Sequence, residues 1–186
     1  MKIYFASSNI SKFEEMRVLL PFNLHYLELD TNEVQGTSED IINHKIHRAK
    51  REEIVAGSAL LVDDNCLALE GLHGFPGVYI KDFLNIGFDN IEDIVQKVGR
   101  NATARCYLGL YCNDKVKIFT GSVNGEIVPR RAGRCFGFDS IFLPDGKDKT
   151  FSEMGGEEKN QISHRGMASK AMVDYLRSGN LLCVFE

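Results

Sequence analysis

Short apolar runs alternate with amphipathic stretches along this chain of 186 residues. Runs of four to eight apolar residues are typical of buried strands, and apolar positions three or four apart are typical of helices. Strands are predicted at residues 2–6, 24–29, 59–62, 103–112, 115–123 and 140–143, with a short extension at 126–128 and an apolar tail at 181–185. Helices are predicted at residues 10–20, 39–56, 81–98 with a break near Gly87, 157–162, and from 163 to an end marked by Gly179. This alternation predicts an α/β domain with a mixed sheet.

Polar and glycine residues mark several boundaries of these elements. Ser163 is a candidate N-cap of the last helix, and Asn113-Asp114 between two strands is a strong hairpin signal. Gly57 is predicted to close the helix over 39–56. The apolar side of that helix is predicted to consist of Ile41, Ile42, Ile46, Ala49 and Ile54.

Length and composition restrict the class of protein. A chain of 186 residues with 44% hydrophobic residues suits one domain, here residues 1–186, with a substantial core. The formal charge of −4 argues against a general nucleic-acid binder, and no apolar run reaches the 18 residues of a membrane span. The odd set of five cysteines lacks a C-x-x-C pair, and the chain begins directly with a strand-like run. We therefore expect reduced thiols, no zinc site and a cytoplasmic location.

The first candidate for chemistry is the acidic pair Asp63-Asp64, which follows the apolar run 59–62. Side chains alternate across a strand, so the two carboxylates are expected to point in different directions. A carboxylate at the end of a buried strand is well placed to hold a hard cation. The alternative is a solvated acidic end of a strand.

Three further segments suggest anion or base binding, each with a structural alternative. The turn Ser7-Ser8-Asn9 enters a helix with Lys12 in its first turn, where a phosphate would offset a lysine that opposes the helix dipole. The block 136–139 has two aromatic rings and an aspartate, which suit either a core or a base-stacking surface. The basic loop 130–134 is either a solvated turn or an anion contact.

Four blocks follow one another along the chain: FASSNISKFEE, VDDNCLALEGLHGFPGVYIK, FGFDSIFLPDG and SEMGGEEKNQISHRGMA. Together and in this order they resemble the inosine triphosphate pyrophosphatase family, the Ham1-type nucleoside-triphosphate pyrophosphatases. The resemblance implies a single elongated α/β domain of the Ham1/Maf-like type, with a central twisted mixed sheet flanked by helices and an active-site cleft. It implies hydrolysis of ITP, dITP and XTP to the monophosphate and pyrophosphate, with Mg²⁺ as cofactor and a homodimeric assembly.

The resemblance also assigns roles to residues of this chain. Contacts to the triphosphate side are expected from Ser7, Ser8, Asn9, Lys12, Lys45, Asp64, Asn65 and Lys81. The base is expected to lie between Phe136, Gly137, Phe138 and Asp139 on one side and Lys159, His164 and Arg165 on the other. Glu33 and Asp64 are the expected metal ligands. Asp64 is also the expected catalytic base, with Asp63 as a candidate helper.

This chain departs from the family pattern at a few positions. Ser8 stands where glycine is common, Asn65 where serine or threonine is usual, and Phe138 where tryptophan or tyrosine is common. Two rival hypotheses remain: a related pyrophosphatase with another base preference, including modified pyrimidines, and a nucleotide-binding sensor without turnover. A P-loop enzyme and a zinc base deaminase are disfavoured because their signatures are missing from the sequence.

Overall fold

The computed structural model describes residues 1–29, 34–133 and 136–180. Its strands are β1 Ile3–Ser7, β2 His25–Glu28, β3 Ala59–Leu69, β4 Pro76–Gly77, β5 Asn101–Cys112, β6 Lys115–Ile127 and β7 Phe142–Pro144. Its α-helices are α1 Ile10–Leu19, α2 Ser38–Ala49, α3 Ile80–Asn85, α4 Phe88–Val98, α5 Gly156–Ile162 and α6 His164–Tyr175. Short helical turns follow at Glu53–Val55, Glu70–Leu72 and Leu176–Asn180. The predicted tail strand at 181–185 lies outside the described residues.

The strands pair into one mixed sheet, in the order β2-β1-β3-β5-β6-β7, with β4 added beside β3. Strand β1 runs parallel to β2 and to β3, with Tyr4 opposite His25 on one side and Leu60 on the other. The pairs β3 with β4 and β6 with β7 are antiparallel. The predicted α/β class with a mixed sheet is confirmed.

Two compact units share the chain. The first comprises Met1–Asp64, Tyr107–Gly121 and Met167–Glu186, and the second comprises Asn65–Cys106 and Ser122–Gly166. Each unit has a hydrophobic core of its own. The expectation of one elongated domain with a cleft stays a prediction.

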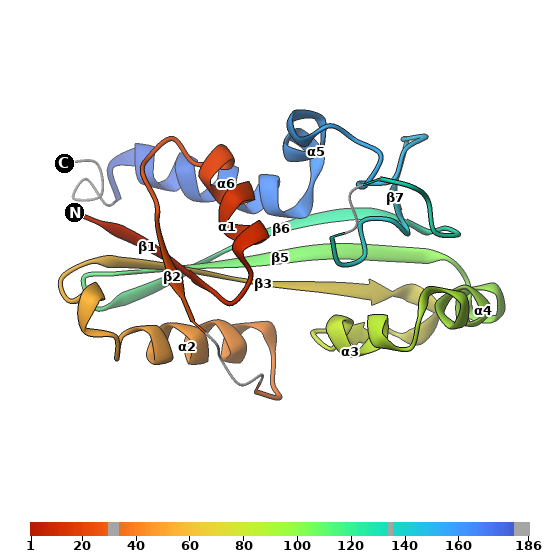
Figure 1. Ribbon diagram of the computed structural model, residues 1–186, viewed down its shortest axis with the longest axis horizontal. Coiled ribbons are helices and arrows are strands. Elements are labelled where there is room, and N and C mark those ends of the chain that lie inside the picture. The colour runs from red at the N-terminus through yellow and green to blue at the C-terminus, as the bar shows by residue number, and fades with distance from the viewer. Residues whose placement is uncertain (30–33, 134–135, 181–186) are drawn as a thin grey trace. The chain divides into compact units, whose positions relative to one another are not determined.

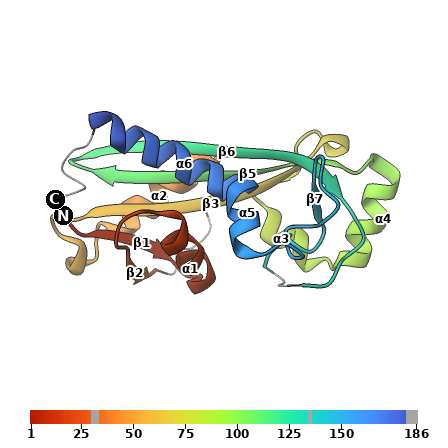
Figure 2. The ribbon, with the colours of Figure 1, turned by 90° about the horizontal axis from the view of Figure 1, so that it is seen from above.

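In the first unit, helices cover both faces of the strands. Figure 1 shows α2 on one face of β1 and β3 and α1 with α6 on the other, and Figure 2 shows α6 in front of the strands and α2 behind them. Ile42 and Ile46 of α2 share a core cluster with Leu60 and Val62 of β3. The even-numbered residues of β3 therefore face α2 in this stretch, and the odd-numbered residues face the side of α1.

In the second unit, α3 and α4 lie on one side of the strands, and α5 with the β7 segment lies on the other (Figure 1). Ile91 and Val95 are the buried residues of α4, one turn apart. They share a core cluster with Leu67 of β3 and with Phe142 of β7. Residues 136–166, which include the expected base-binding residues, are anchored to the sheet through this core.

The helix predicted over 39–56 is shorter than expected. It begins with a capping box between Thr37 and Asp40, whose hydrogen bonds from Thr37 lower the pKa of the Asp40 carboxyl. The α-helix ends at Ala49, and a separate 3₁₀ turn follows. The assignment of Ile54 to the apolar side was wrong, because its side chain is exposed. The position one turn beyond Ala49 is Glu53, so the helical apolar period stops there.

The central strand is longer than the apolar run that predicted it. Strand β3 continues through Asp63, Asp64 and Asn65 to Leu69, so the acidic pair lies inside the strand instead of at its end. Cys66, Leu67 and Leu69 are buried again after the polar residues. A window of apolar residues could not show this continuation, because three polar residues interrupt it. The last helix also differs from its prediction: the α-helix ends at Tyr175, and a π-helical turn follows at Leu176–Asn180.

The predicted turns at Asn113-Asp114 and at Gly87 are confirmed. Asn113 and Asp114 both have positive φ, 50° and 58°, as a two-residue hairpin turn requires. Gly87 separates α3 from α4. No helix within the described part of the chain is long and apolar enough to cross a membrane. Cys66, Cys106 and Cys112 are buried as thiols, and Cys135 and Cys183 lie outside the described residues.

Gly109 of β5 provides a test of the packing between α2 and the sheet. A Cβ atom at this position would lie 2.3 Å from Cγ2 of Ile42 and 3.3 Å from Cγ2 of Val62. We expect Gly109→Val to lower the free energy of unfolding by about 1–3 kcal/mol, the usual cost of overpacking a core. Urea unfolding measures it. Gly156→Ala is the matched control, because its Cβ meets nothing within 4 Å. Equal stability of the Gly109 variant and wild type would contradict the close packing.

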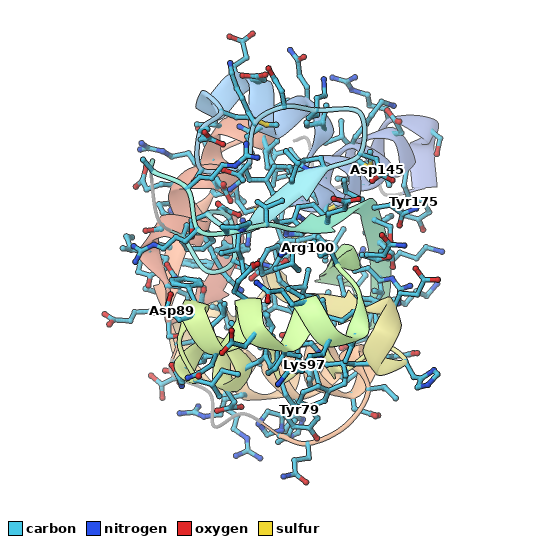
Figure 3. The ribbon with its side chains drawn as sticks, turned by 90° about the vertical axis from the view of Figure 1, so that its right-hand side faces the viewer. Tyr79, Asp89, Lys97, Arg100, Asp145 and Tyr175 are labelled. Atoms are coloured by element: carbon cyan, nitrogen blue, oxygen red, sulfur yellow. The ribbon has the colours of Figure 1, made fainter. Side chains whose placement is uncertain are left out.

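A pH-dependent ion pair stabilises the second unit next to α4. Arg100, which lies beside α4 in Figure 3, donates from Nη1 to Oε2 of Glu92 at 3.0 Å and to the carbonyl of Ile127 at 2.8 Å. The Arg100 hydrogen bond lowers the pKa of Glu92 from its ordinary value near 4.5. A carboxyl with a lowered folded-state pKa adds stability above its unfolded pKa and loses it as the pH falls through the folded value.

We expect Arg100→Gln to lower the free energy of unfolding by about 1 kcal/mol at pH 7. The difference from wild type should be smaller at pH 3 than at pH 7, because the pair weakens as the pH falls through the folded-state pKa of Glu92. Chemical unfolding at both pH values measures the two differences. A deficit that is as large at pH 3 as at pH 7 would show that Arg100 stabilises only through its bond to the Ile127 carbonyl.

Candidate active site

The two carboxylates of the acidic pair in β3 contact two different lysines of the first unit. Asp63 Oδ1 lies 3.0 Å from Nζ of Lys12 on α1. Asp64 Oδ1 lies 3.0 Å from Nζ of Lys45 on α2, and the same ammonium donates to the Asp63 carbonyl at 2.8 Å. The strand alternation that directs Leu61 and Val62 to opposite faces also separates these carboxylates. The expectation that the two side chains diverge is confirmed.

Asp64 keeps one carboxylate oxygen available. Its Oδ2 is buried and has no hydrogen-bond partner among the described residues, whereas Oδ1 accepts from Lys45. Burial of an unpaired carboxylate oxygen is costly, so such an atom points to a missing ligand. Oxygen is the donor that Mg²⁺ prefers, and Mg²⁺ is typically held by one or two carboxylates together with substrate phosphates.

The donor set around Asp64 fits such an ion. Within residues 1–29, 34–133 and 136–180, no group of three His, Cys, Asp or Glu side chains gathers as a closed metal cage. Glu33, the other expected ligand, lies outside the described residues. One open carboxylate suits a cation that takes the rest of its ligands from substrate and water.

The turn before α1 is held by its own side chains. Asn9 is the N-cap, and its Oδ1 accepts from the amide of Ser11 at 3.0 Å. Ser7 Oγ accepts from the amide of Asn9 at 3.1 Å, and Tyr26 donates its hydroxyl to the Ser7 carbonyl at 2.9 Å. Burial, with a smaller contribution from nearby Glu28, raises the pKa of Tyr26, so the hydroxyl keeps its proton and remains a donor. Ser8 is exposed. The turn is thus rigid, and Lys12 is its cationic group.

A second lysine–aspartate pair lies in the second unit. Lys159 of α5 donates to Oδ2 of Asp139 at 2.7 Å, and both side chains are about nine-tenths buried or more. Buried charges need partners, which explains why these two residues occur together. The resemblance to the family implied that both residues hold the base, and the structure brings them into contact.

The two aromatic rings of the block 136–139 differ in burial. Phe138 lies in the core, where its ring packs against Phe142 and His164. This burial agrees with the core alternative for Phe138, and contact of its ring with a base stays a prediction. Phe136 is half-buried, and the charged groups of Lys159 and Arg165 lie 5.6 Å and 5.7 Å from its ring centre. Cations at this distance favour the negative face of an aromatic ring and fix the position of the Phe136 ring.

The start of α6 presents His164 and Arg165, which are both buried. The expected N-cap at Ser163 is confirmed, because its Oγ accepts from the amide of Gly166 at 3.1 Å. Phe151 was missed by sequence reasoning, although its ring lies 5.8 Å from His164 and 5.9 Å from the Lys159 ammonium. Only knowledge of the tertiary contacts identifies it, since nothing in its local sequence pattern indicates a site.

The remaining candidates are spread along the chain. Asn65 continues β3, and its Oδ1 is buried with no hydrogen-bond partner in the described part of the protein. Lys81 is exposed in the first turn of α3, and Gly137 is exposed with a φ of 57°. Their contacts with substrate stay predictions, as do those of Ser7, Ser8 and Asn9.

The basic loop 130–134 has a structural explanation at its described residues. Arg131 donates to the Asp148 carbonyl at 2.7 Å and lies 3.4 Å from Glu153. The guanidinium of Arg130 lies 4.9 Å from the centre of the Phe88 ring. These contacts favour the interpretation of the loop as a surface turn.

Comparisons with known proteins identify the family of this chain. The sequence profile of the Ham1 family matches residues 3–175. The chain therefore belongs to the Ham1 family. An inosine triphosphate pyrophosphatase of Encephalitozoon cuniculi is 43% identical over 97% of this chain and 96% of its own length. The inosine triphosphate pyrophosphatase of Scheffersomyces stipitis is 35% identical over 95% of this chain and 98% of its own length.

Solved structures give the same fold. The Ham1 protein of Staphylococcus aureus is similar with a TM-score of 0.77 and 29% identity, covering 96% of this chain and all of its own. A HAM1 protein from Coxiella burnetii has a TM-score of 0.80 and 27% identity, covering 96% of this chain and 99% of its own. The expected Ham1-type α/β fold, with a mixed sheet flanked by helices, is therefore confirmed.

Proposed function

We propose that this protein hydrolyses non-standard purine nucleoside triphosphates, namely ITP, dITP and XTP, to the monophosphate and pyrophosphate. The carboxylate of Asp64 carries the proposal: one oxygen is fixed by Lys45 and the other is buried without a hydrogen-bond partner among the described residues. Such an atom is poised for a cation or a proton. Relatives named inosine triphosphate pyrophosphatase support the substrate class.

The triphosphate belongs with the lysines of the first unit. A triphosphate carries about four negative charges, and Lys12 and Lys45 supply ammonium groups next to the acidic pair. Glu33 and Asp64 are the proposed ligands of Mg²⁺. When bound, Mg²⁺ would offset phosphate charge and lower the pKa of the attacking water.

The proposed bond cleavage lies between the α and β phosphates. Water attacks the α phosphorus, the bond to the bridging oxygen breaks, and pyrophosphate leaves with the electron pair. Asp64 accepts the proton that the water loses, because its Oδ2 has no competing hydrogen bond among the described residues. Lys45 holds the carboxylate in place through Oδ1 and through the backbone of Asp63.

The base belongs with the second unit. Phe136 offers the stacking ring, with Gly137 beside it, and Phe138 supports the segment from the core. Lys159, His164 and Arg165 can donate hydrogen bonds to a 6-oxo group, and Asp139 can accept one from a ring N–H. Adenine presents a 6-amino group instead, so it would leave these groups unpaired, which is a strong basis for rejection.

Product analysis tests this function against its rivals. The protein is incubated with ITP in ¹⁸O-labelled water, and the products are separated by mass spectrometry. We expect pyrophosphate and IMP with the label in IMP. Labelled inorganic phosphate with IDP would mean that a different bond is cut. Turnover of modified pyrimidine triphosphates in preference to ITP would favour the rival pyrophosphatase, and tight ITP binding without products would favour the sensor.

Assembly and location complete the proposal. We propose a homodimer in the cytoplasm that acts on free nucleotides and on neither nucleic acid nor membranes. Sedimentation equilibrium tests the assembly, and a mass near 20.9 kDa at all concentrations would contradict the dimer.

A further inference from the structure

We infer that Asp63 is a positioning residue, whose buried carboxylate holds the ammonium of Lys12 ready for a phosphate, and that Asp63 does not take part in proton transfer. The inference rests on the proposed function, because it assigns Lys12 to the triphosphate. It gives Asp63 a role distinct from that of its neighbour Asp64.

The two aspartates belong to different faces of β3. The core cluster of Leu60 and Val62 with α2 shows which face the even-numbered residues occupy, and Asp64 follows them to Lys45. Asp63 is on the opposite face and meets Lys12 of α1. Two carboxylates on opposite faces of one strand cannot both point at the same attacking water. Geometry thus separates Asp63 from the proton transfer proposed for Asp64.

The burial of Asp63 shows that the ion pair is tightly held. Its side chain is 1% exposed, while that of Lys12 is 19% exposed. The carboxylate therefore depends on protein partners for its charge, and the lysine keeps a route to solvent and to an incoming anion. A buried acid with a partly exposed lysine is the arrangement expected when the acid fixes the lysine for an external ligand.

The place of Lys12 on its helix explains why it needs an anchor. It lies in the first turn of α1, which contains no acidic residue, so its charge opposes the helix dipole. A long flexible side chain in that position would lose considerable freedom on binding a phosphate. Asp63 offsets the charge before substrate arrives and restricts the side chain in advance, which lowers the cost of binding.

A double-mutant cycle tests the inference. Asp63→Asn, Lys12→Met and the combined variant are compared with wild type for kcat and KM with ITP. We expect Asp63→Asn to raise KM about tenfold with kcat within threefold of wild type. Because Asp63 acts through Lys12, the combined variant should resemble Lys12→Met alone. Asp174→Asn is the matched control, since it removes an exposed partner of Lys170 in the same unit and should change neither constant.

Several kinetic results would overturn the inference. One is a fall in kcat of a hundredfold or more in Asp63→Asn at unchanged KM, which indicates a base. Another is a combined variant whose change in KM equals the product of the changes in the two single variants, which would mean that the two residues act independently. Should Asp63→Asn fail to fold, as judged by its melting temperature, Asp63→Glu replaces it: a raised KM at constant kcat supports positioning, and a lowered kcat at constant KM contradicts it.

A binding measurement keeps this inference separate from the proposed function. If wild type releases no pyrophosphate from ITP, the proposed function fails, and the cycle is repeated by calorimetry with inorganic tripolyphosphate. If Asp63→Asn weakens tripolyphosphate binding when Lys12 is present, and has no further effect when Lys12 is replaced by Met, the positioning role is still supported. Unchanged binding in both single variants would overturn it.

Discussion

Replacing Asp64 by asparagine is expected to lower kcat for ITP by at least about a thousandfold while the protein stays folded. The amide keeps the shape of the side chain and can still meet Lys45, which donates to Oδ1 at 3.0 Å. It can neither accept the proton of an attacking water nor supply a negative oxygen in place of the buried Oδ2. Losing a general base and a metal ligand together accounts for an effect of this size.

Pyrophosphate release under saturating ITP measures the loss, and the melting temperature verifies the fold. A suitable control is Asp114→Asn, a change at the exposed hairpin turn of the same unit, where the partner Lys50 is 3.9 Å away. Turnover of the Asp64 variant within tenfold of wild type would remove Asp64 from both roles. An unfolded variant would indicate instead that the Lys45–Asp64 pair is structural.

Replacing Asp139 by asparagine is expected to lower kcat/KM for ITP about a hundredfold and to leave kcat/KM for ATP unchanged or raised. An ionised carboxylate can only accept hydrogen bonds, and it suits the ring N–H of a 6-oxo purine. The asparagine amide can also donate, which suits the unprotonated ring nitrogen of adenine. The ratio of ITP to ATP hydrolysis should therefore collapse, because discrimination rests on matched buried donors and acceptors.

Parallel assays with ITP and ATP measure this ratio in wild type and variant. In the variant, the amide oxygen of the asparagine can still accept a hydrogen bond from Lys159. The contact, which is 2.7 Å long in the wild type, can therefore be retained, and we expect the variant to fold. Lys149→Met is a matched control, since it removes an exposed pairing with Glu158 of α5. An unchanged ITP to ATP ratio in Asp139→Asn would place base recognition elsewhere.

The hydrophobic pattern predicted elements where the period is unbroken. The amphipathic α4 and the hairpin at Asn113 follow directly from local chemistry. The pattern failed where a site interrupts a regular element. Three polar residues hide the second half of β3, since Asp63, Asp64 and Asn65 stand where a strand in the core would carry apolar side chains.

The sequence indicated which residues form the site, but it did not indicate which of their side chains contact each other. The resemblance to the family selected Lys12, Lys45 and Asp64, and periodicity implied that neighbouring aspartates diverge. Neither could show which lysine meets which aspartate, because Lys12 and Asp63 are 51 residues apart. The sequence also could not show that Phe138 is buried whereas Phe136 is only half-buried, since both are phenylalanines in one short block and only packing distinguishes them.

The most direct test of the central claim is pyrophosphate release from ITP and from ATP, each with Mg²⁺ and with excess EDTA. Inorganic phosphate is followed in parallel, without a coupling pyrophosphatase. The proposed function predicts pyrophosphate from ITP only when Mg²⁺ is present, and almost none from ATP under either condition. Equal release from ATP and ITP would contradict the base assignment, and release of phosphate in place of pyrophosphate would contradict the proposed cleavage.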